Sequence, residues 1–201
     1  GEEVVGVIEE VGAEVSRFRT GQRVYVYPGT SCGVCDACRR GAGNLCASMQ
    51  IMGFHRDGSF AEYVFAPQAS LIPIPDGLPD DVTILAEPLS RCLNALERAA
   101  LKAGDCVGVW GSGPAGTLIR RAAAAKGATG WTVEPHAGRR ARIGGFEEAP
   151  AEGCDVAVVA IGDAAAYQQA VKSLRPRGCL VLFSGLSPAT ACQPVDFNTM
   201  H

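Results

Sequence analysis

The spacing of apolar residues changes near residue 75, and this change divides the chain into two parts with different predicted structures. The first part has short apolar runs between turn-forming residues and shows no helical period, so it predicts strands joined by turns. A glycine- and cysteine-rich loop occupies residues 28–50. The expected strands of this part are residues 4–8, 24–27, 60–65 and 71–74.

After residue 75, apolar runs of helical period alternate with short runs typical of buried strands. Leu89, Leu93 and Leu96 share one face of a helix predicted over residues 85–101. Strands that alternate with helices are typical of a parallel α/β sheet. We therefore expect one domain at residues 1–80 and a second, built on such a sheet, at 81–201. The other elements expected in the second domain are strands at 105–110, 131–133, 155–161 and 179–183 and helices at 114–126 and 163–174.

Composition and charge argue against several classes of protein. The 201 residues are 47% hydrophobic and 19% charged, which is ordinary for a globular protein, and the formal net charge is −3. The short cluster of Arg139, Arg140 and Arg142 is too small for the basic face of a nucleic-acid binder. No apolar run is long enough to span a bilayer. Acidic residues at positions 2, 3, 9 and 10 argue against a signal peptide, so we expect a cytoplasmic location.

Four of the nine cysteines follow the spacing C-x2-C-x2-C-x7-C within the loop. Zn²⁺ binds four thiolates in a tetrahedron, and closely spaced cysteines on a turning backbone can supply them. Because every position is a cysteine, the pattern predicts a closed, structural zinc site. An iron–sulfur cluster and four unrelated thiols are the alternatives, although the bacterial ferredoxin run has a closer fourth cysteine that proline follows. The predicted zinc ligands are Cys32, Cys35, Cys38 and Cys46.

A glycine motif of the form G-x-G-x-x-G follows the strand expected at 105–110 and opens the next helix. In dinucleotide-binding folds the first glycine makes a tight turn, the second lets the backbone approach a pyrophosphate, and the third lets helix and strand pack closely. The N–H groups at the start of the helix face the phosphates. A glycine turn that binds no nucleotide is the alternative. The candidate cofactor-binding residues of the motif are Gly111, Gly113, Pro114, Ala115 and Gly116.

Glu134 ends the next expected strand, eighteen residues after Gly116. A carboxylate in this position binds the hydroxyl groups of an adenosine ribose. It would also repel a 2′-phosphate, so the sequence favours NAD over NADP. The neighbouring Arg139 and Arg140 weaken that preference slightly.

With both motifs placed, the chain closely resembles the zinc-binding medium-chain dehydrogenases, which include alcohol, sorbitol and threonine dehydrogenases. The resemblance implies a partial GroES-like catalytic domain at residues 1–80 and a Rossmann NAD-binding domain at 81–201. It also implies that Glu134 and Arg139 hold the adenosine ribose, as an acid and an arginine do in the NAD-using members. Besides the two motifs, it rests on G-E-E-V-V-G at 1–6, G-Q-R-V at 21–24, D-G-S-F-A-E-Y at 57–63 and E-P-L at 87–89, the last typical of the polyol and threonine branch.

The resemblance further implies a second, catalytic zinc that polarises a substrate alcohol before hydride passes to the nicotinamide. Glu3 and Glu87 would bind this zinc or hydrogen-bond to its ligands. Glu2 stands where the family has a ligand histidine, and it is either a carboxylate ligand or a solvated charge. His55 is expected to be a surface or hydrogen-bonded residue, with a place near the substrate as the alternative.

Family members continue on both sides of this sequence, so we expect a fragment or a truncated member, and their usual assembly implies a homo-oligomeric parent protein. The leading hypothesis is an oxidoreductase that passes a hydride from a secondary alcohol of a polyol, amino alcohol or cyclitol to NAD. The second is a non-catalytic protein that binds a dinucleotide and structural zinc. A zinc-ribbon nucleic-acid module is the third, and the acidic balance and the glycine motif argue against it.

Overall fold

The computed structural model describes residues 1–194 and 196, and the chain separates into two compact units. The first unit comprises Gly1–Glu87, and the second begins at Pro88. The sequence predicts the domain boundary between residues 80 and 81, seven residues before the division in the structure. In the structure, the Arg23 guanidinium connects this stretch to the first unit, because it donates to the Leu78 carbonyl oxygen at 2.8 Å and pairs with Asp80.

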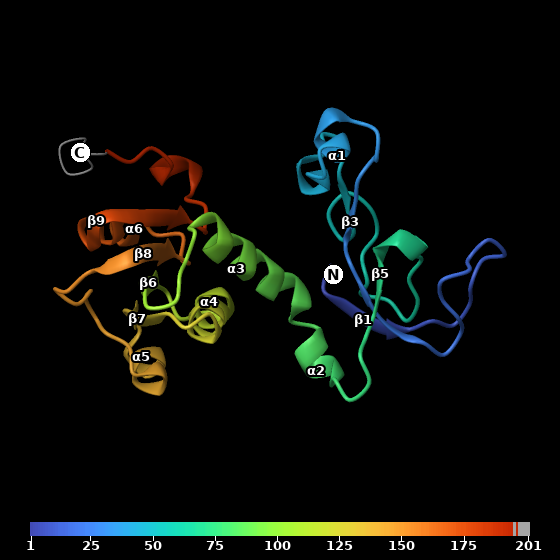
Figure 1. Ribbon diagram of the computed structural model, residues 1–201, viewed down its shortest axis with the longest axis horizontal. Coiled ribbons are helices and arrows are strands. Elements are labelled where there is room, and N and C mark those ends of the chain that lie inside the picture. The colour runs from blue at the N-terminus through green and yellow to red at the C-terminus, as the bar shows by residue number, and fades with distance from the viewer. Residues whose placement is uncertain (195, 197–201) are drawn as a thin grey trace. The chain divides into compact units, whose positions relative to one another are not determined.

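An antiparallel sheet in the order β1-β2-β5 forms the centre of the first unit (Figure 1). Val4 of β1 lies opposite Val26 of β2, and both pack with Met52 in a small buried core. The sequence predicts the three strands of this sheet but not the short helices. The elements of the unit are β1 (Val4–Val7), β2 (Arg23–Val26), β3 (Gly29–Thr30), α1 (Asp36–Arg39), β4 (Gln50–Ile51), β5 (Leu71–Pro73) and α2 (Asp80–Thr83), with 3-10 turns at Gly43–Leu45 and Gln68–Ser70.

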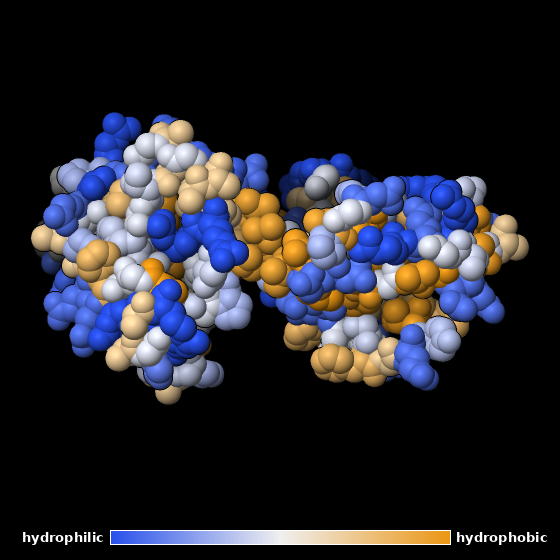
Figure 2. All heavy atoms as spheres, turned by 90° about the horizontal axis from the view of Figure 1, so that it is seen from below, coloured by the Kyte–Doolittle hydropathy of each residue, from blue (hydrophilic) through white to orange (hydrophobic). Residues whose placement is uncertain are grey.

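The strand predicted at residues 60–65 is wrong, because the structure assigns no strand to this segment. Phe60 and Phe65 are 96% and 98% exposed. Other apolar residues also reach the surface on the face of the molecule shown in Figure 2. A short run rich in aromatic and β-branched residues predicts a strand, but a strand needs a partner for its backbone N–H and C=O groups. Within the described residues, segment 60–65 has no place in the β1-β2-β5 sheet.

The second unit is built on a parallel sheet with the strand order β7-β6-β8-β9, which confirms the predicted α/β class (Figure 1). Strand β6 is internal and pairs with β7 on one side and with β8 on the other. The strands are β6 (Cys106–Trp110), β7 (Thr129–Val133), β8 (Cys154–Val159) and β9 (Leu174–Leu182), and the helices are α3 (Ala86–Arg98), α4 (Pro114–Ala125), α5 (Ala137–Ile143) and α6 (Ala164–Lys172).

Two apolar cores stabilise this unit, as expected for a parallel sheet that is covered on both faces. Val107 and Val109 of β6 belong to a core that also contains Ile119 of α4. Trp110 belongs to the other core, together with Tyr167 of α6. Among the described residues, no helix has both the length and the apolar character that crossing a bilayer requires.

The two tryptophans of the chain pack edge to face in the second unit, with ring centroids 5.2 Å apart and an interplanar angle of 76°. The ring of Trp131 covers Gly108, where an added Cβ would lie 2.5 Å from the nearest ring atom. A larger residue at this position would therefore require the Trp131 ring to move. Because both indoles lie in the second unit, tryptophan fluorescence reports on that unit.

Two features of the second unit differ from the sequence prediction. Helix α5 was not predicted, because it lacks an apolar helical period; it begins where the His136 ring accepts a hydrogen bond from the Arg139 backbone N–H at 3.3 Å. Strand β9 begins at Leu174, five residues before its predicted start. Pro176 and Gly178 indicate a break in regular structure. Strand β9 nevertheless continues through both residues, and its pairing with β8 shifts register there.

Candidate metal centre and dinucleotide site

The cysteine loop is closed at its base by a short antiparallel pairing of β3 with β4, in which Gly29 lies opposite Ile51. This pairing brings the two ends of the loop together. Gly33 and Gly41 have φ values of +73° and +76°, a backbone conformation that a side chain disfavours, and they let the chain turn within the loop. The loop therefore has the tight turns needed to direct several side chains toward one point.

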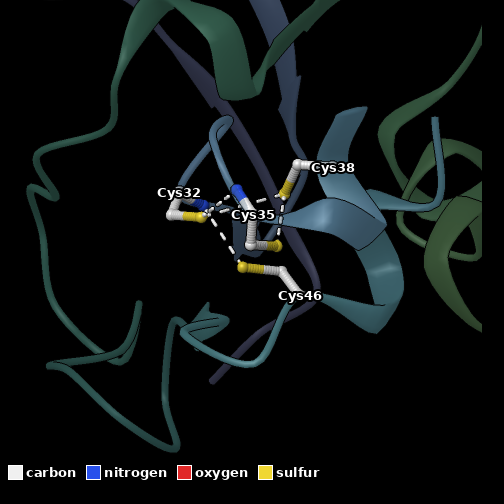
Figure 3. A group of neighbouring side chains, drawn as sticks. All are labelled: Cys32, Cys35, Cys38 and Cys46. Carbon is white, nitrogen blue, oxygen red and sulfur yellow. Dashed lines mark hydrogen bonds between the residues drawn. The ribbon is translucent and has the colours of Figure 1, made fainter. Parts of the chain in front are cut away.

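The four predicted zinc ligands converge inside this loop (Figure 3). All four sulfur atoms lie within 4.8 Å of one another. The Cys38 sulfur is 3.5 Å from that of Cys35 and 4.0 Å from that of Cys32. Four zinc–sulfur bonds of about 2.3 Å in a tetrahedron set neighbouring sulfurs about 3.8 Å apart. The spacing and the all-thiol donor set thus fit a tetrahedral zinc ion.

Backbone N–H groups surround these sulfurs as they do around metal-bound thiolates. The Cys32 N–H donates to the Cys46 sulfur at 3.4 Å, and the Cys35 N–H donates to the Cys32 sulfur at 3.3 Å. Hydrogen bonding from the Cys38 backbone and thiol lowers the pKa of Cys35 to about 6. Partial burial and the Cys35 sulfur raise the pKa of Cys38 to about 11. The loop thus favours a thiolate, the form that binds metal, at Cys35 near neutral pH.

The residues expected near a catalytic zinc lie outside the cysteine loop, in residues 1–87. Glu3 is exposed at the start of β1, Glu2 is half-buried, and Glu87 is buried in the first turn of α3. Across residues 1–194, the cysteine cluster is the only group of three or more His, Cys, Asp or Glu side chains that is arranged to share a metal ion. His55 is hydrogen-bonded, because its Nδ1 accepts from the Ile51 N–H at 2.9 Å.

The glycine motif connects β6 to α4 in the second unit. Gly111 follows the strand with φ +98°, and Gly113 precedes the helix, whose first residue is Pro114. A Cβ on Gly116 would lie 2.0 Å from the Gly111 carbonyl oxygen, so helix and loop touch where only glycine fits. The Thr117 N–H donates to the Gly113 carbonyl oxygen at 2.9 Å. This is the first bond of the helix, so the N–H groups before it have no helical acceptor and are available to phosphates.

Parallel pairing of β6 with β7 places Glu134 beside this motif. Trp110, at the end of β6, lies opposite Val133, so both strands deliver their next residues to the same edge of the sheet. The Ser112 N–H and hydroxyl both donate to Glu134 Oε2, at 3.0 and 2.6 Å. The structure thus brings the predicted glycine loop and the predicted acid into direct contact.

The Glu134 carboxylate is buried and ionised. Glu134 is 1% exposed, and its Oε1 accepts from the His136 N–H at 2.9 Å and lies 3.7 Å from Arg139 Nη2. Burial acts to raise its pKa, but the hydrogen bonds from Ser112 and His136 and the charge of Arg139 outweigh this effect and lower the pKa. The carboxylate therefore keeps its charge at neutral pH.

Sequence reasoning missed one neighbour of this acid, Ser112, and identified another, Arg140, only as a nearby positive charge. Ser112 stands at the first x of the G-x-G-x-x-G motif, where any residue is allowed. Its hydroxyl group was the only sign in the sequence that it could donate a hydrogen bond. Arg140 donates to the carbonyl oxygens of Glu134 and Pro135, both at 2.9 Å, and pairs with Glu147 at 3.1 Å. Arg140 therefore fixes the backbone after β7, whereas the half-exposed Arg139 faces the carboxylate.

Comparison with known proteins agrees with both halves of this arrangement. Residues 1–76 match the alcohol dehydrogenase GroES-like domain family. Sorbitol dehydrogenase of Bacillus subtilis strain 168 is 39% identical over 64% of this chain and 36% of its own length. L-Threonine 3-dehydrogenase of Anaeromyxobacter dehalogenans strain 2CP-C is 32% identical over 98% of this chain and 62% of its own length.

Solved structures extend the likeness to the whole fold. A zinc-binding dehydrogenase from Sinorhizobium meliloti 1021, bound to NADP, has a TM-score of 0.89 and 29% identity, covering 100% of this chain and 64% of its own. The chain thus spans less than two thirds of the length of each of these relatives. Residues 1–76 thus match a domain of the alcohol dehydrogenase type, and the whole chain is similar to zinc-binding, sorbitol and threonine dehydrogenases.

Proposed function

We propose that this chain forms part of an NAD-dependent dehydrogenase that takes a hydride from a secondary alcohol of a polyol, amino alcohol or cyclitol. Residues 1–80 would form its catalytic domain and residues 81–201 its NAD-binding domain, in a homo-oligomeric parent protein. The sorbitol and threonine dehydrogenases among its relatives support this substrate class. Bound NAD would accept the hydride at its nicotinamide ring.

The observation that carries this proposal is the buried Glu134 carboxylate, held against the glycine loop by Ser112. A charged carboxylate at the carboxyl end of β7 offers acceptors to two ribose hydroxyls and repels a 2′-phosphate. The relative from Sinorhizobium meliloti is bound to NADP, so the preference for NAD rests on Glu134 alone. Gly111, Gly113, Pro114, Ala115 and Gly116 would hold the pyrophosphate, and Arg139 would lie beside the ribose.

For the metals, we propose a structural zinc at the four cysteines, whose sulfur spacing fits the ion. This zinc would have a structural role, because four thiolates leave no coordination position for water or substrate. Glu2, Glu3 and Glu87 remain proposals for the neighbourhood of the reacting alcohol. Since the described residues offer no second set of three ligands, no catalytic step is assigned to a metal held by these three residues.

Replacing Glu134 with alanine should weaken NAD binding roughly tenfold or more, because hydrogen bonds to a buried charge are lost. NADP should lose much less, since removing the carboxylate also removes its repulsion of the 2′-phosphate. Titration of both cofactors against the purified chain, followed by tryptophan fluorescence, measures the two dissociation constants.

Glu134→Gln is the matched variant, because it keeps the size of the side chain and removes its charge. It should relax the preference for NAD while disturbing the fold less than alanine does. An equal loss of NAD and NADP in Glu134→Ala would mean that Glu134 does not select the cofactor.

The alternative function is a protein that binds a dinucleotide and structural zinc without catalysis, which the presence of Glu2 in place of a ligand histidine favours. Zinc analysis and a screen for alcohol-dependent NADH formation over polyols and aminocyclitols separate the two, on this chain and on a longer parent protein. Two zinc ions and NADH formation support the enzyme. One zinc and dinucleotide binding without NADH formation in both proteins would refute it.

A further inference from the structure

The hydrogen bonds to Glu134 account for most of the acceptor positions of its carboxylate. An ionised carboxylate has about four such positions. Oε2 accepts twice from Ser112, through its backbone N–H and its hydroxyl. Oε1 accepts from the His136 N–H and faces Arg139 at 3.7 Å, which is longer than a hydrogen bond. One position, on Oε1, is therefore open without displacing a donor.

A ribose diol needs two acceptor positions, one for each hydroxyl. The first is the open position on Oε1, where the half-exposed Arg139 side chain can move aside. The second must come from a donor already in place. Backbone N–H groups cannot withdraw without unfolding the loop, and Ser112 is held further because Thr117 Oγ1 donates to its carbonyl oxygen at 3.3 Å. The Ser112 hydroxyl is the exception, because it rotates about a single bond.

The surroundings of Ser112 allow this rotation. Ser112 is half-buried and lines a cavity of about 190 Å³ beside the glycine loop, together with Thr117 and Thr132. Glu134 itself is 1% exposed while the Ser112 hydroxyl donates to Oε2, so the hydroxyl takes the place that water would otherwise occupy. The hydroxyl therefore satisfies a buried charge in the free chain, and an incoming hydroxyl group can take its place.

On the basis of the proposed function, we infer that the Ser112 hydroxyl occupies the position of one adenosine ribose hydroxyl and is exchanged for it when the dinucleotide binds. The exchange replaces one O–H···O⁻ bond with another, so the carboxylate keeps its donors in both states. Ser112 thus lowers the affinity for the diol and stabilises the free chain. It is a positioning residue that acts through Glu134.

The test compares Ser112→Ala with the wild-type chain in binding ADP and 2′,3′-dideoxy-ADP, measured by calorimetry. Alanine removes the competing hydroxyl and leaves Oε2 with an acceptor position that a ribose hydroxyl can fill without displacing a protein donor. ADP should therefore bind roughly fivefold to tenfold more tightly to the variant. The dideoxy compound should show no such gain, because it has no hydroxyl to offer.

Two further measurements separate this role from a merely structural one. Without ligand, the Ser112→Ala chain should have a lower melting temperature than the wild type. Saturating ADP should reduce this difference in melting temperature. Ser112→Thr keeps the hydroxyl and should show no selective gain for ADP. Equal changes for ADP and its dideoxy analogue, or weaker binding of both, would overturn the exchange. A wild-type chain that binds neither ADP nor NAD would instead overturn the proposed function.

Discussion

Replacing Cys35 with serine is expected to empty the metal site and to unfold the cysteine loop. A structural zinc site couples metal binding to folding, because its ligands converge only in the folded loop. Serine offers a neutral hydroxyl where the thiol, with its pKa of about 6, supplies a thiolate. Zinc content should fall by about one ion per chain relative to the wild type. Elemental analysis of the purified chain measures this loss, and limited proteolysis should show new cleavage within residues 31–49.

Cys192→Ser is the matched control, since Cys192 is an exposed thiol that lies outside the cluster. This variant should keep its zinc and its resistance to proteolysis. Tryptophan fluorescence should change little in either variant, because both tryptophans belong to the second unit. A Cys35→Ser chain with unchanged zinc content and an unchanged proteolytic pattern would refute the assignment of the loop as a metal site.

The second large effect is expected for Gly116→Ala. The added methyl group would lie 2.0 Å from the Gly111 carbonyl oxygen and 3.4 Å from a methyl group of Val109. The oxygen belongs to the backbone, so α4 must move away from β6, which disrupts the core around Ile119. Overpacking of this kind costs about 3 kcal/mol or more. Denaturation in urea, followed by tryptophan fluorescence, should show a lower midpoint, and ADP binding should be lost.

Gly113→Ala provides the contrast within the same motif. A Cβ at Gly113 meets no atom within 4 Å, and its φ of −64° suits any residue. This variant should therefore unfold at the same urea concentration as the wild type. It should still bind ADP more weakly, because the methyl group obstructs the approach of the pyrophosphate. A wild-type midpoint for Gly116→Ala would show that the packing argument is wrong.

The sequence predicts best those parts of the molecule that local patterns determine. The alternation of strands and helices in the second unit follows from apolar runs and from glycine and proline at element ends, and it locates β6, α4 and β7. Position in the family motif locates Glu134, and cysteine spacing locates the metal loop. These features involve residues that are close in sequence or joined by one parallel pairing.

Features that depend on distant partners were harder to predict. Residues 60–65 have the pattern of a strand, yet pairing is decided by the rest of the sheet. The division at Glu87 reflects contacts such as those of Arg23, which sequence patterns do not reveal. The contact between Ser112 and Glu134 joins two loops that only the sheet brings together. A serine in a glycine motif gives no local sign of this contact.

The short pairing of β3 with β4 has a consequence for how such a domain can diversify. Gly29 and Ile51 are opposite each other, so the chain leaves and re-enters the domain at points only about 5 Å apart. Because the two ends of the loop between β3 and β4 lie side by side, the loop can be lengthened, shortened or exchanged without moving the flanking strands. A tight hairpin could therefore replace the cysteine-bearing segment while β1, β2 and β5 keep their places in the sheet.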